Sequence, residues 1–237
     1  MKKYLLPMML IIVFLNLISC GGKKGVVKKL EADDLYARGQ QFFQNKKYVD
    51  AMDDFKAVVF NYSGSKLALD ANYFLAECYL RTRDYQGAVA EFQQILNTYS
   101  PCRYDDEARF KIALCYYKDS PNYALDQSET TVKAGQSLNL YFTYLSDTTW
   151  APEARQLKIS LEEKLAHKDF DAGRIYFKMK RYAPAKLYLE NLMAQYPQTH
   201  WAQEAQKLLD QIPASAKVQQ ALPDSIPAAA ADSSQGK

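Results

Sequence analysis

The phrase that decides the fold occurs three times along the chain: KKYVDAMDDF begins at Lys46, RDYQGAVAEF at Arg83 and KRYAPAKLYL at Lys180. Each copy has a basic first residue, then a tyrosine, an alanine three positions after the tyrosine, and a large apolar residue four positions after that alanine. The alanine and the apolar residue share one face of a helix, because residues four apart lie one turn above each other. The phrase therefore predicts a turn followed by a helix at each of its three places.

A small residue and an aromatic residue stand before each phrase at a fixed spacing. In the second copy they are Ala76 and Tyr79, followed by Ala88 and Phe92, which gives steps of 3, 9 and 4. Small residues let two antiparallel helices approach closely, and the aromatic residues fill the space beside them. The other two copies keep the same steps with Gly39, Phe42, Ala51 and Phe55, and with Gly173, Tyr176, Ala185 and Leu189.

This spacing resembles the tetratricopeptide repeat, in which small, aromatic and alanine positions recur over two antiparallel helices. After residue 20 we find no β-branched run of strand length that is bounded by turn signals. We therefore expect an all-α fold, a tetratricopeptide-repeat solenoid of about four helix pairs plus a capping helix at about 198–211. Stacking of the pairs would bury each one against the next.

The third repeat is interrupted. Ala113 and Tyr116 supply its small and aromatic residues, but Leu125 stands where the next alanine is expected, and Ala134 is the best candidate for it. We therefore expect an inserted loop over 118–133 and a second helix after it. From residue 153 to residue 171 the chain has no Gly or Pro, which predicts one extended helix that serves repeats three and four.

The N-terminus has the features of an export signal. Lys2 and Lys3 precede a mostly apolar stretch, Leu5–Ile18, which is shorter than the roughly 20 residues that span a bilayer. Leu-Ile-Ser-Cys at 17–20 resembles the lipobox of bacterial lipoproteins, which implies cleavage before Cys20 and acylation of its thiol. The alternatives are an ordinary signal peptide with a chance cysteine, or a signal anchor. Gly-Gly-Lys-Lys follows Cys20, and by resemblance to lipoprotein sorting rules the absence of Asp at the next position favours the outer membrane. No acidic cluster follows Cys20 either, which favours the periplasmic face.

The boundaries that follow are a signal peptide over 1–19, an acylated linker over 20–30, the repeat domain over 31–212, and a Pro/Ala/Ser-rich tail over 213–237 that we expect to be disordered. The near balance of 30 basic and 27 acidic residues gives no support to nucleic acid as a partner. Three cysteines remain after Cys20, an odd number, and Cys78 and Cys115 fall at matching points of two repeats. Such stacked positions are too far apart for a disulfide, so we interpret these cysteines, with Cys102, as small buried hydrophobes.

The lipobox, the repeats, the insertion in repeat three and the long helix before YFKMKRYAPA together resemble the BamD family, lipoproteins of the β-barrel assembly machinery, over residues 20 to about 211. The stretch Asp126-Gln127-Ser128 and the following Ala134 also resemble the third repeat of that family. The resemblance implies as partners a BamA-like barrel protein, other lipoproteins of the assembly complex and unfolded outer-membrane clients, with the membrane held through the acyl anchor. The chain departs from the family in lacking a full fifth repeat, and in having Leu187-Tyr188 where members often carry an Asn-Arg partner contact.

The first helix of each repeat lines the concave face of such a solenoid, so it supplies the candidate binding residues. Aromatic residues stand three positions before the small residue in all four repeats, and apolar residues stand four positions after it. Arg81 and Lys118, like Lys178, stand five positions after it and could hold a client's terminal carboxylate. The alternatives are a peptide groove, in which we place Tyr73, and helix packing. The candidate groove residues are Tyr36, Phe43, Tyr73, Leu80, Arg81, Phe110, Tyr117, Lys118, Phe170 and Phe177.

Catalysis finds no support in the residue pattern. His167 and His200 are the two histidines, and neither stands at metal-ligand spacing from a cysteine or from another histidine. No Gly-rich loop suited to phosphates is present. We therefore expect a binding protein without catalytic residues, metal or cofactor. The leading interpretation is a component of barrel assembly, and the alternative is a generic periplasmic tetratricopeptide-repeat scaffold lipoprotein of the cell envelope.

Overall fold

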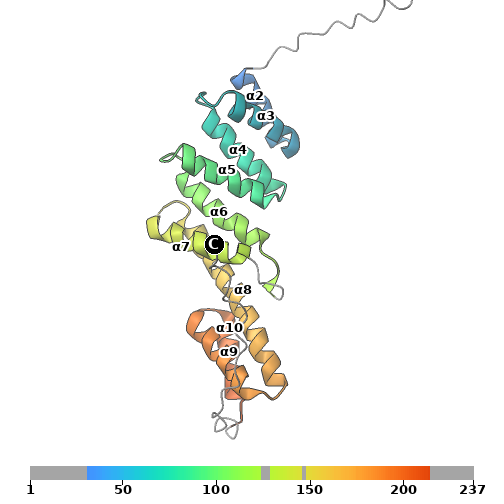
Figure 1. Ribbon diagram of the computed structural model, residues 1–237, viewed down its shortest axis with the longest axis vertical. Helices are drawn as coiled ribbons and strands as arrows, with labels where there is room; N and C mark the ends of the chain where they lie inside the picture. The colour runs from blue at the N-terminus through green and yellow to red at the C-terminus, as the bar shows by residue number, and fades with distance from the viewer. Residues whose placement is uncertain (1–30, 124–128, 146–147, 214–237) are drawn as a thin grey trace, which may run out of the picture.

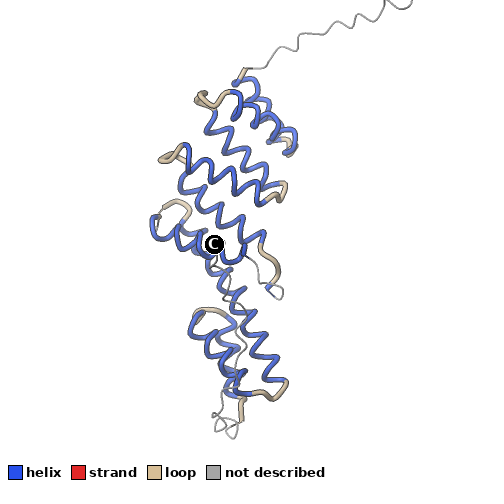
Figure 2. Tube along the Cα trace, viewed as in Figure 1, coloured by secondary structure: helices blue, strands red, loops and turns tan. Residues whose placement is uncertain are grey.

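The computed structural model describes residues 31–123, 129–145 and 148–213, and within them the chain forms helices and no strand. The helices stack one after another along the long axis, from α2 at one end to α9 and α10 at the other (Figure 1). Figure 2 shows the short connections between them. The helices are α2 (Ala32–Gln44), α3 (Tyr48–Asn61), α4 (Ala68–Arg81), α5 (Tyr85–Thr98), α6 (Asp105–Asp119), α7 (Glu129–Tyr144), α8 (Ala151–Lys178), α9 (Tyr182–Gln195) and α10 (His200–Asp210).

The prediction of an all-α tetratricopeptide-type solenoid is confirmed. Repeats one and two are α2 with α3 and α4 with α5, repeat three is α6 with α7, and repeat four is the second half of α8 with α9. The expected capping helix is α10. Consecutive helices pack against each other throughout, so the core is a continuous series of neighbouring interfaces.

The basic residue that opens each phrase ends the preceding helix. Lys46, Arg83 and Lys180 have φ values of 59°, 65° and 59°, the left-handed conformation that terminates many helices. In the first turn the Lys47 N–H donates to the Phe42 carbonyl at 2.9 Å, and the Lys46 N–H donates to the Phe43 carbonyl at 3.0 Å. The other two turns repeat this pair of hydrogen bonds, so all three are Schellman turns.

The small residues permit the close approach that the spacing predicts. A Cβ atom at Gly39 would lie 2.9 Å from the ring of Phe55, and one at Gly173 would lie 2.8 Å from the side chain of Leu189. Phe55 and Leu189 are the apolar residues of their own phrases, and both are fully buried. The sequence step from the small residue to the apolar residue therefore corresponds to direct contact between the two helices of a repeat.

The third repeat differs in its turn and in the length of its loop. Ser120 follows α6 with an extended backbone, φ −72° and ψ 138°, in place of the left-handed residue. The expected loop over 118–133 was too long, because α7 begins at Glu129 and not at Ala134. No Gly or Pro lies between these two residues, Glu129 pairs with Lys133 one turn later, and Thr131 is already buried, so this segment can be helical. Ala134 is fully buried, as its assignment to the repeat requires.

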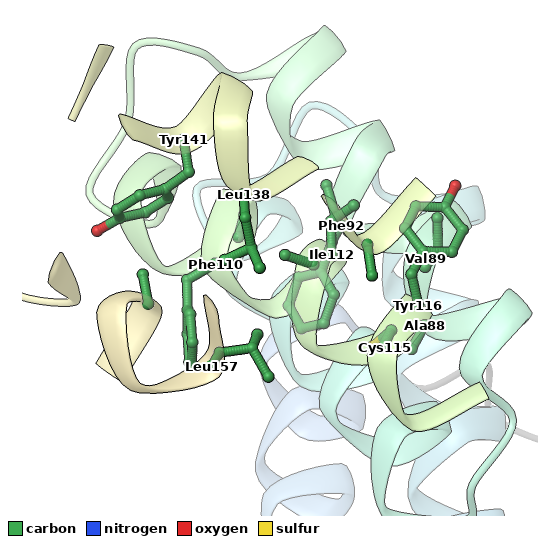
Figure 3. Close-up of a cluster of buried hydrophobic side chains, with 14 of the residues drawn as sticks. Ala88, Val89, Phe92, Phe110, Ile112, Cys115, Tyr116, Leu138, Tyr141 and Leu157 are labelled. Carbon is green, nitrogen blue, oxygen red and sulfur yellow. The ribbon is translucent and has the colours of Figure 1, made fainter. Parts of the chain in front are cut away.

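The extended helix is confirmed as α8, which spans 28 residues. Leu157 and Leu161 in its first half belong to the large core cluster of repeats two and three. Figure 3 shows this cluster, where Phe92, Phe110, Leu138 and Leu157 converge from α5, α6, α7 and α8. From Ala166 onward the side chains of α8 join a separate cluster with α9 and α10.

The three cysteines in the described part of the chain are free. Cys78 and Cys115 are fully buried, which confirms their role as small core residues, and burial raises the pKa of both thiols to about 12. Cys102 is only partly buried, so the expectation for it was too strong. The predicted signal peptide, Cys20, the linker, Asp126-Gln127-Ser128 and the tail from residue 214 lie outside the described residues.

Candidate functional site

The aromatic residue three positions before the small residue has the same neighbour type in every repeat. Its ring contacts a second aromatic ring, which lies in the helix after next along the chain or at the start of that helix. These contacts explain why the position is aromatic four times: the ring fills the seam between successive first helices. The pairs and their centroid distances are Tyr36 with Phe74 at 6.3 Å, Tyr73 with Tyr104 at 4.1 Å, Phe110 with Trp150 at 5.2 Å, and Phe170 with Trp201 at 5.2 Å.

Burial divides this set of four into two kinds. Phe110 and Phe170 are 6% and 8% exposed, so their rings offer little surface to a peptide. Tyr36 and Tyr73 are only partly buried, and each keeps an accessible edge. Packing is therefore the role that burial favours for Phe110 and Phe170, while peptide binding by the whole set stays a prediction.

Tyr73 lies within a network of charges in the seam between repeats two and three. Its hydroxyl donates to Glu107 Oε1 at 2.8 Å and accepts from Lys111 Nζ at 3.1 Å. Lys111 is 8% exposed and pairs both with Glu107, at 2.6 Å, and with Glu77. Burial and the neighbouring charges of Glu77 and Glu107 raise the pKa of Tyr73, so this hydroxyl stays protonated. The network joins α4 to α6, because each helix supplies one of the two glutamates.

The apolar residues four positions after the small residue lie at the ends of the first helices. All four are partly buried. Phe43 packs edge-on against Tyr48 of its own turn at 5.5 Å, and Phe177 packs in the same way against Tyr182 at 5.7 Å. The Lys164 ammonium lies 5.8 Å from the ring centroid of Tyr117. Leu80 packs against the large core cluster.

The basic candidates Arg81 and Lys118 are exposed, as is Lys178. Arg81 also pairs with Glu77, one turn earlier in α4, at 3.2 Å. The cationic positions therefore stand beside the half-buried apolar ones at the same end of successive first helices, as the sequence spacing predicts. An edge of this kind presents apolar surface and positive charge together, which suits a peptide with aromatic side chains and a terminal carboxylate.

Sequence reasoning missed the residues that receive these aromatic rings, although the sequence holds a signal for them. Tyr104, Trp150 and Trp201 each stand four residues before a fully or nearly fully buried alanine, in the echoing stretches YDDEA, WAPEA and WAQEA. In YDDEA and WAPEA the acidic residues lie in the first turn of α6 and of α8, where their charge is favourable. A comparison of helix starts, in addition to the helix ends, would have found these contacts.

The first of these stretches also holds a polar junction of three helices. Asp106 accepts a hydrogen bond from the Tyr141 hydroxyl at 2.5 Å, from Thr148 Oγ1 at 2.8 Å and from the Trp150 N–H at 3.1 Å. Burial and the bond to Asp106 raise the pKa of Tyr141 to about 12. One carboxylate of α6 thus fixes the end of α7 and the start of α8.

The sequence from residue 28 to residue 222 matches the family model described as "YfiO: Outer membrane lipoprotein". This match covers most of the chain. The chain belongs to the YfiO family of outer-membrane lipoproteins. This is the BamD-type family, so the resemblance found in the sequence is confirmed at the level of the family. No curated protein gives a significant match. Within the described ranges, no helix has the length and the apolar character needed to cross a bilayer.

Proposed function

We propose that this YfiO-family protein is a component of the outer-membrane β-barrel assembly machinery and binds the barrel-forming partner, unfolded barrel clients, or both. The observation that carries the proposal is the family match over residues 28–222, which begins eight residues after Cys20. A stack of helix pairs is an extended binding surface, and such repeats serve as scaffolds for other proteins. We propose Cys20 as the lipid anchor, and the periplasmic face of the outer membrane as the location.

The C-terminal repeat is the surface that we propose for the barrel partner. Leu187 and Tyr188 occupy the place where family members often carry the Asn-Arg contact, and both side chains are exposed. Tyr188 stacks on Tyr176 of α8 at 5.5 Å, which holds its ring in place. Leu187 and Tyr188 would contact a partner by burying apolar and aromatic surface. An arginine at this position would instead form charged hydrogen bonds.

For the client we propose the edge of the first helices in repeats one to three. Phe43, Leu80 and Tyr117 are partly buried there, and Arg81 and Lys118 are exposed beside them. A barrel protein's C-terminal segment alternates aromatic and polar residues and ends in a carboxylate, so its chemistry matches this edge. The same residues would act as positioning contacts, without any catalytic step.

The proposal is tested by affinity purification from detergent-solubilised outer membranes. We expect the wild-type chain to recover a large barrel protein with periplasmic domains, and Leu187→Lys with Tyr188→Ala to lose it while keeping its own membrane fraction and melting temperature. Ile159→Lys, an exposed apolar position on the first half of α8, is the matched control. Recovery of peptidoglycan or division factors alone would reject barrel assembly in favour of the alternative, a scaffold lipoprotein of the cell envelope.

The anchor has its own test. Acylation needs the thiol, so Cys20→Ser should leave an uncleaved or soluble periplasmic protein, detected by intact mass and by membrane fractionation. Cys102→Ser, which changes a partly exposed cysteine in the loop between α5 and α6, should keep the wild-type mass shift and fraction. A Cys20→Ser chain with unchanged acylated mass and membrane fraction would reject the lipid anchor.

A further inference from the structure

Three aromatic rings from three separate segments form one stack beside the long helix. Tyr123 lies between α6 and α7, His167 on α8, and Trp201 in the first turn of α10. The ring centroids of Tyr123 and His167 are 3.6 Å apart, and those of His167 and Trp201 are 3.7 Å apart, with interplanar angles of 22° and 10°. The imidazole is thus enclosed on both faces, and it connects the insertion of the third repeat to α10.

Polar contacts fasten the same two segments to adjacent residues of α8. On one side, Lys164 Nζ donates to Ser120 Oγ at 2.5 Å, at the beginning of the insertion. On the other side, the His200 N–H donates to Glu163 Oε1 at 2.7 Å, at the beginning of α10. The neighbouring residues Glu163 and Lys164 therefore bind α10 and the insertion, respectively. His167 lies one turn further along the same helix.

The stack lies where the apolar core divides. Leu161 belongs to the large cluster of repeats two and three, whereas Ala166 and Phe170 belong to the cluster formed with α9 and α10. We refer to α8 from Ala166 onward, with α9 and α10, as the C-terminal unit. In Figure 1 this unit lies at the end of the stack opposite to α2, and α8 leads into it. Contacts across this division therefore determine how strongly the unit is coupled to the third repeat.

We propose that the Tyr123–His167–Trp201 stack is a clasp that fastens the insertion of the third repeat to α10, so that the third repeat and the C-terminal unit move as one body. Aromatic contacts of this kind stabilise beyond the area that they bury, and here two of them share one ring. Loss of either outer ring uncovers a face of the imidazole and weakens the hold on the other. The clasp does not depend on which partner the protein binds.

The test is hydrogen exchange of the full-length chain in detergent, read at the amides of α10. Tyr123→Ala should raise their exchange rate about 3- to 10-fold, because one stacking contact is lost and α10 opens more often. Tyr123 lies outside α10 and on the opposite face of the imidazole from Trp201, so a merely local effect would not reach these amides. Tyr123→Phe keeps the ring and should exchange as the wild type does.

His167→Ala should raise the same rate, and Tyr123→Ala should add nothing in the His167→Ala background, because the connection is then already broken. Tyr144→Ala is the control, since Tyr144 is an exposed tyrosine at the end of α7. Exchange of α10 in Tyr123→Ala that equals the wild type and the control would overturn the clasp. Fully additive effects of Tyr123→Ala and His167→Ala would overturn it as well.

Discussion

The seam between repeats two and three and the seam between repeats three and four are built in different ways. In the first, Tyr73 stacks on Tyr104, and Lys111 joins a glutamate of α4 to a glutamate of α6. In the second, Phe110 stacks on Trp150, and α8 then continues without a break into repeat four. The first seam is held by side chains between two short helices, whereas the second also has the continuity of one backbone.

The length of α8 shows how such continuity keeps the repeat in frame. In α6, five residues separate the buried alanine of the first turn, Ala108, from the small residue Ala113; in α8, 19 residues separate Ala154 from Gly173. The extra 14 residues make close to four turns at about 3.6 residues per turn. Fourteen residues fall about 40° short of four full turns, so Gly173 lies within about 40° of the direction that a step of five residues from Ala154 would give. The long helix therefore replaces a seam with little rotation of the repeat that follows.

The largest expected effect is at the buried charge network of the first seam. Lys111→Ala should lower the free energy of unfolding by about 3–5 kcal/mol, because Glu77 and Glu107 would lose their shared cation in a desolvated seam. The matched control is Lys133→Ala, whose ion pair with Glu129 is exposed, so that its loss should cost far less. Urea unfolding of both variants gives the comparison. Equal, small losses would show that the seam is hydrated and that its charges are ordinary surface charges.

The second prediction concerns Tyr73, which separates packing from peptide binding. Tyr73→Ala should lower the free energy of unfolding by about 2–4 kcal/mol, somewhat less than a fully buried aromatic residue, because part of its ring is exposed. Tyr73→Phe should cost about 1–2 kcal/mol, since Glu107 and Lys111 would lose a buried partner. Thermal melts are measured beside binding of a labelled barrel C-terminal peptide.

The two measurements on Tyr73 have opposite patterns for the two roles. A groove residue would lose peptide binding while its melting curve stays in place, and a core residue would lose stability first. The contacts of Tyr73 with Tyr104, Glu107 and Lys111 favour the second pattern. Leu80→Ala, at the partly buried edge of α4, provides the reference for the first pattern. A Tyr73→Ala chain that melts as the wild type does and fails to bind the peptide would confirm Tyr73 as a groove residue.

The third prediction concerns the contact between the two helices of one repeat. Ala88 is fully buried at the contact between α4 and α5, so Ala88→Leu should overpack it at a cost of about 1–3 kcal/mol. Ala90→Leu, two residues later on the exposed face of α5, should change stability by less than about 0.5 kcal/mol. Melting temperatures of the two variants suffice. Indistinguishable melts would mean that the repeat frame is misplaced.

The sequence predicts the regular repeats well, because residues at the repeat's fixed sequence spacing are also the residues that contact each other in a helix pair. Gly39, Ala51 and Phe55 are related by steps that bring them together in one helix pair, and the structure confirms the approach of Gly39 to Phe55 and the burial of Ala51. The length of the insertion was misjudged, because a polar stretch such as Glu129–Lys133 can be either loop or helix until its buried face is known. The sequence left groove and packing open for Phe110 and Phe170 for a related reason: the rings that cover them, Trp150 and Trp201, lie far along the sequence.

The smallest expected effect tests the turn that the third repeat lacks. The left-handed backbone of Lys46 is sterically strained, because its Cβ crowds the chain at φ 59°. Lys46→Gly removes the crowding and should raise the free energy of unfolding by about 0.5–1 kcal/mol, even though glycine adds entropy to the unfolded chain. Asn45→Gly, one residue earlier at φ −80°, gains that entropy without any relief and should lower stability by about 0.4–1 kcal/mol.

The decisive result is a change in the free energy of unfolding that has opposite signs in Lys46→Gly and Asn45→Gly. Chemical denaturation of the two variants side by side measures both changes. Arg83→Gly and Lys180→Gly should repeat the gain, because their turns have the same two hydrogen bonds and the same sign of φ. The gains at Lys46 and Lys180 should add, since the α2–α3 and α8–α9 turns lie at opposite ends of the stack. If Lys46→Gly lowers stability as much as Asn45→Gly does, then the basic side chain contributes more to its turn than the strained backbone costs, and the phrase would be basic for that reason.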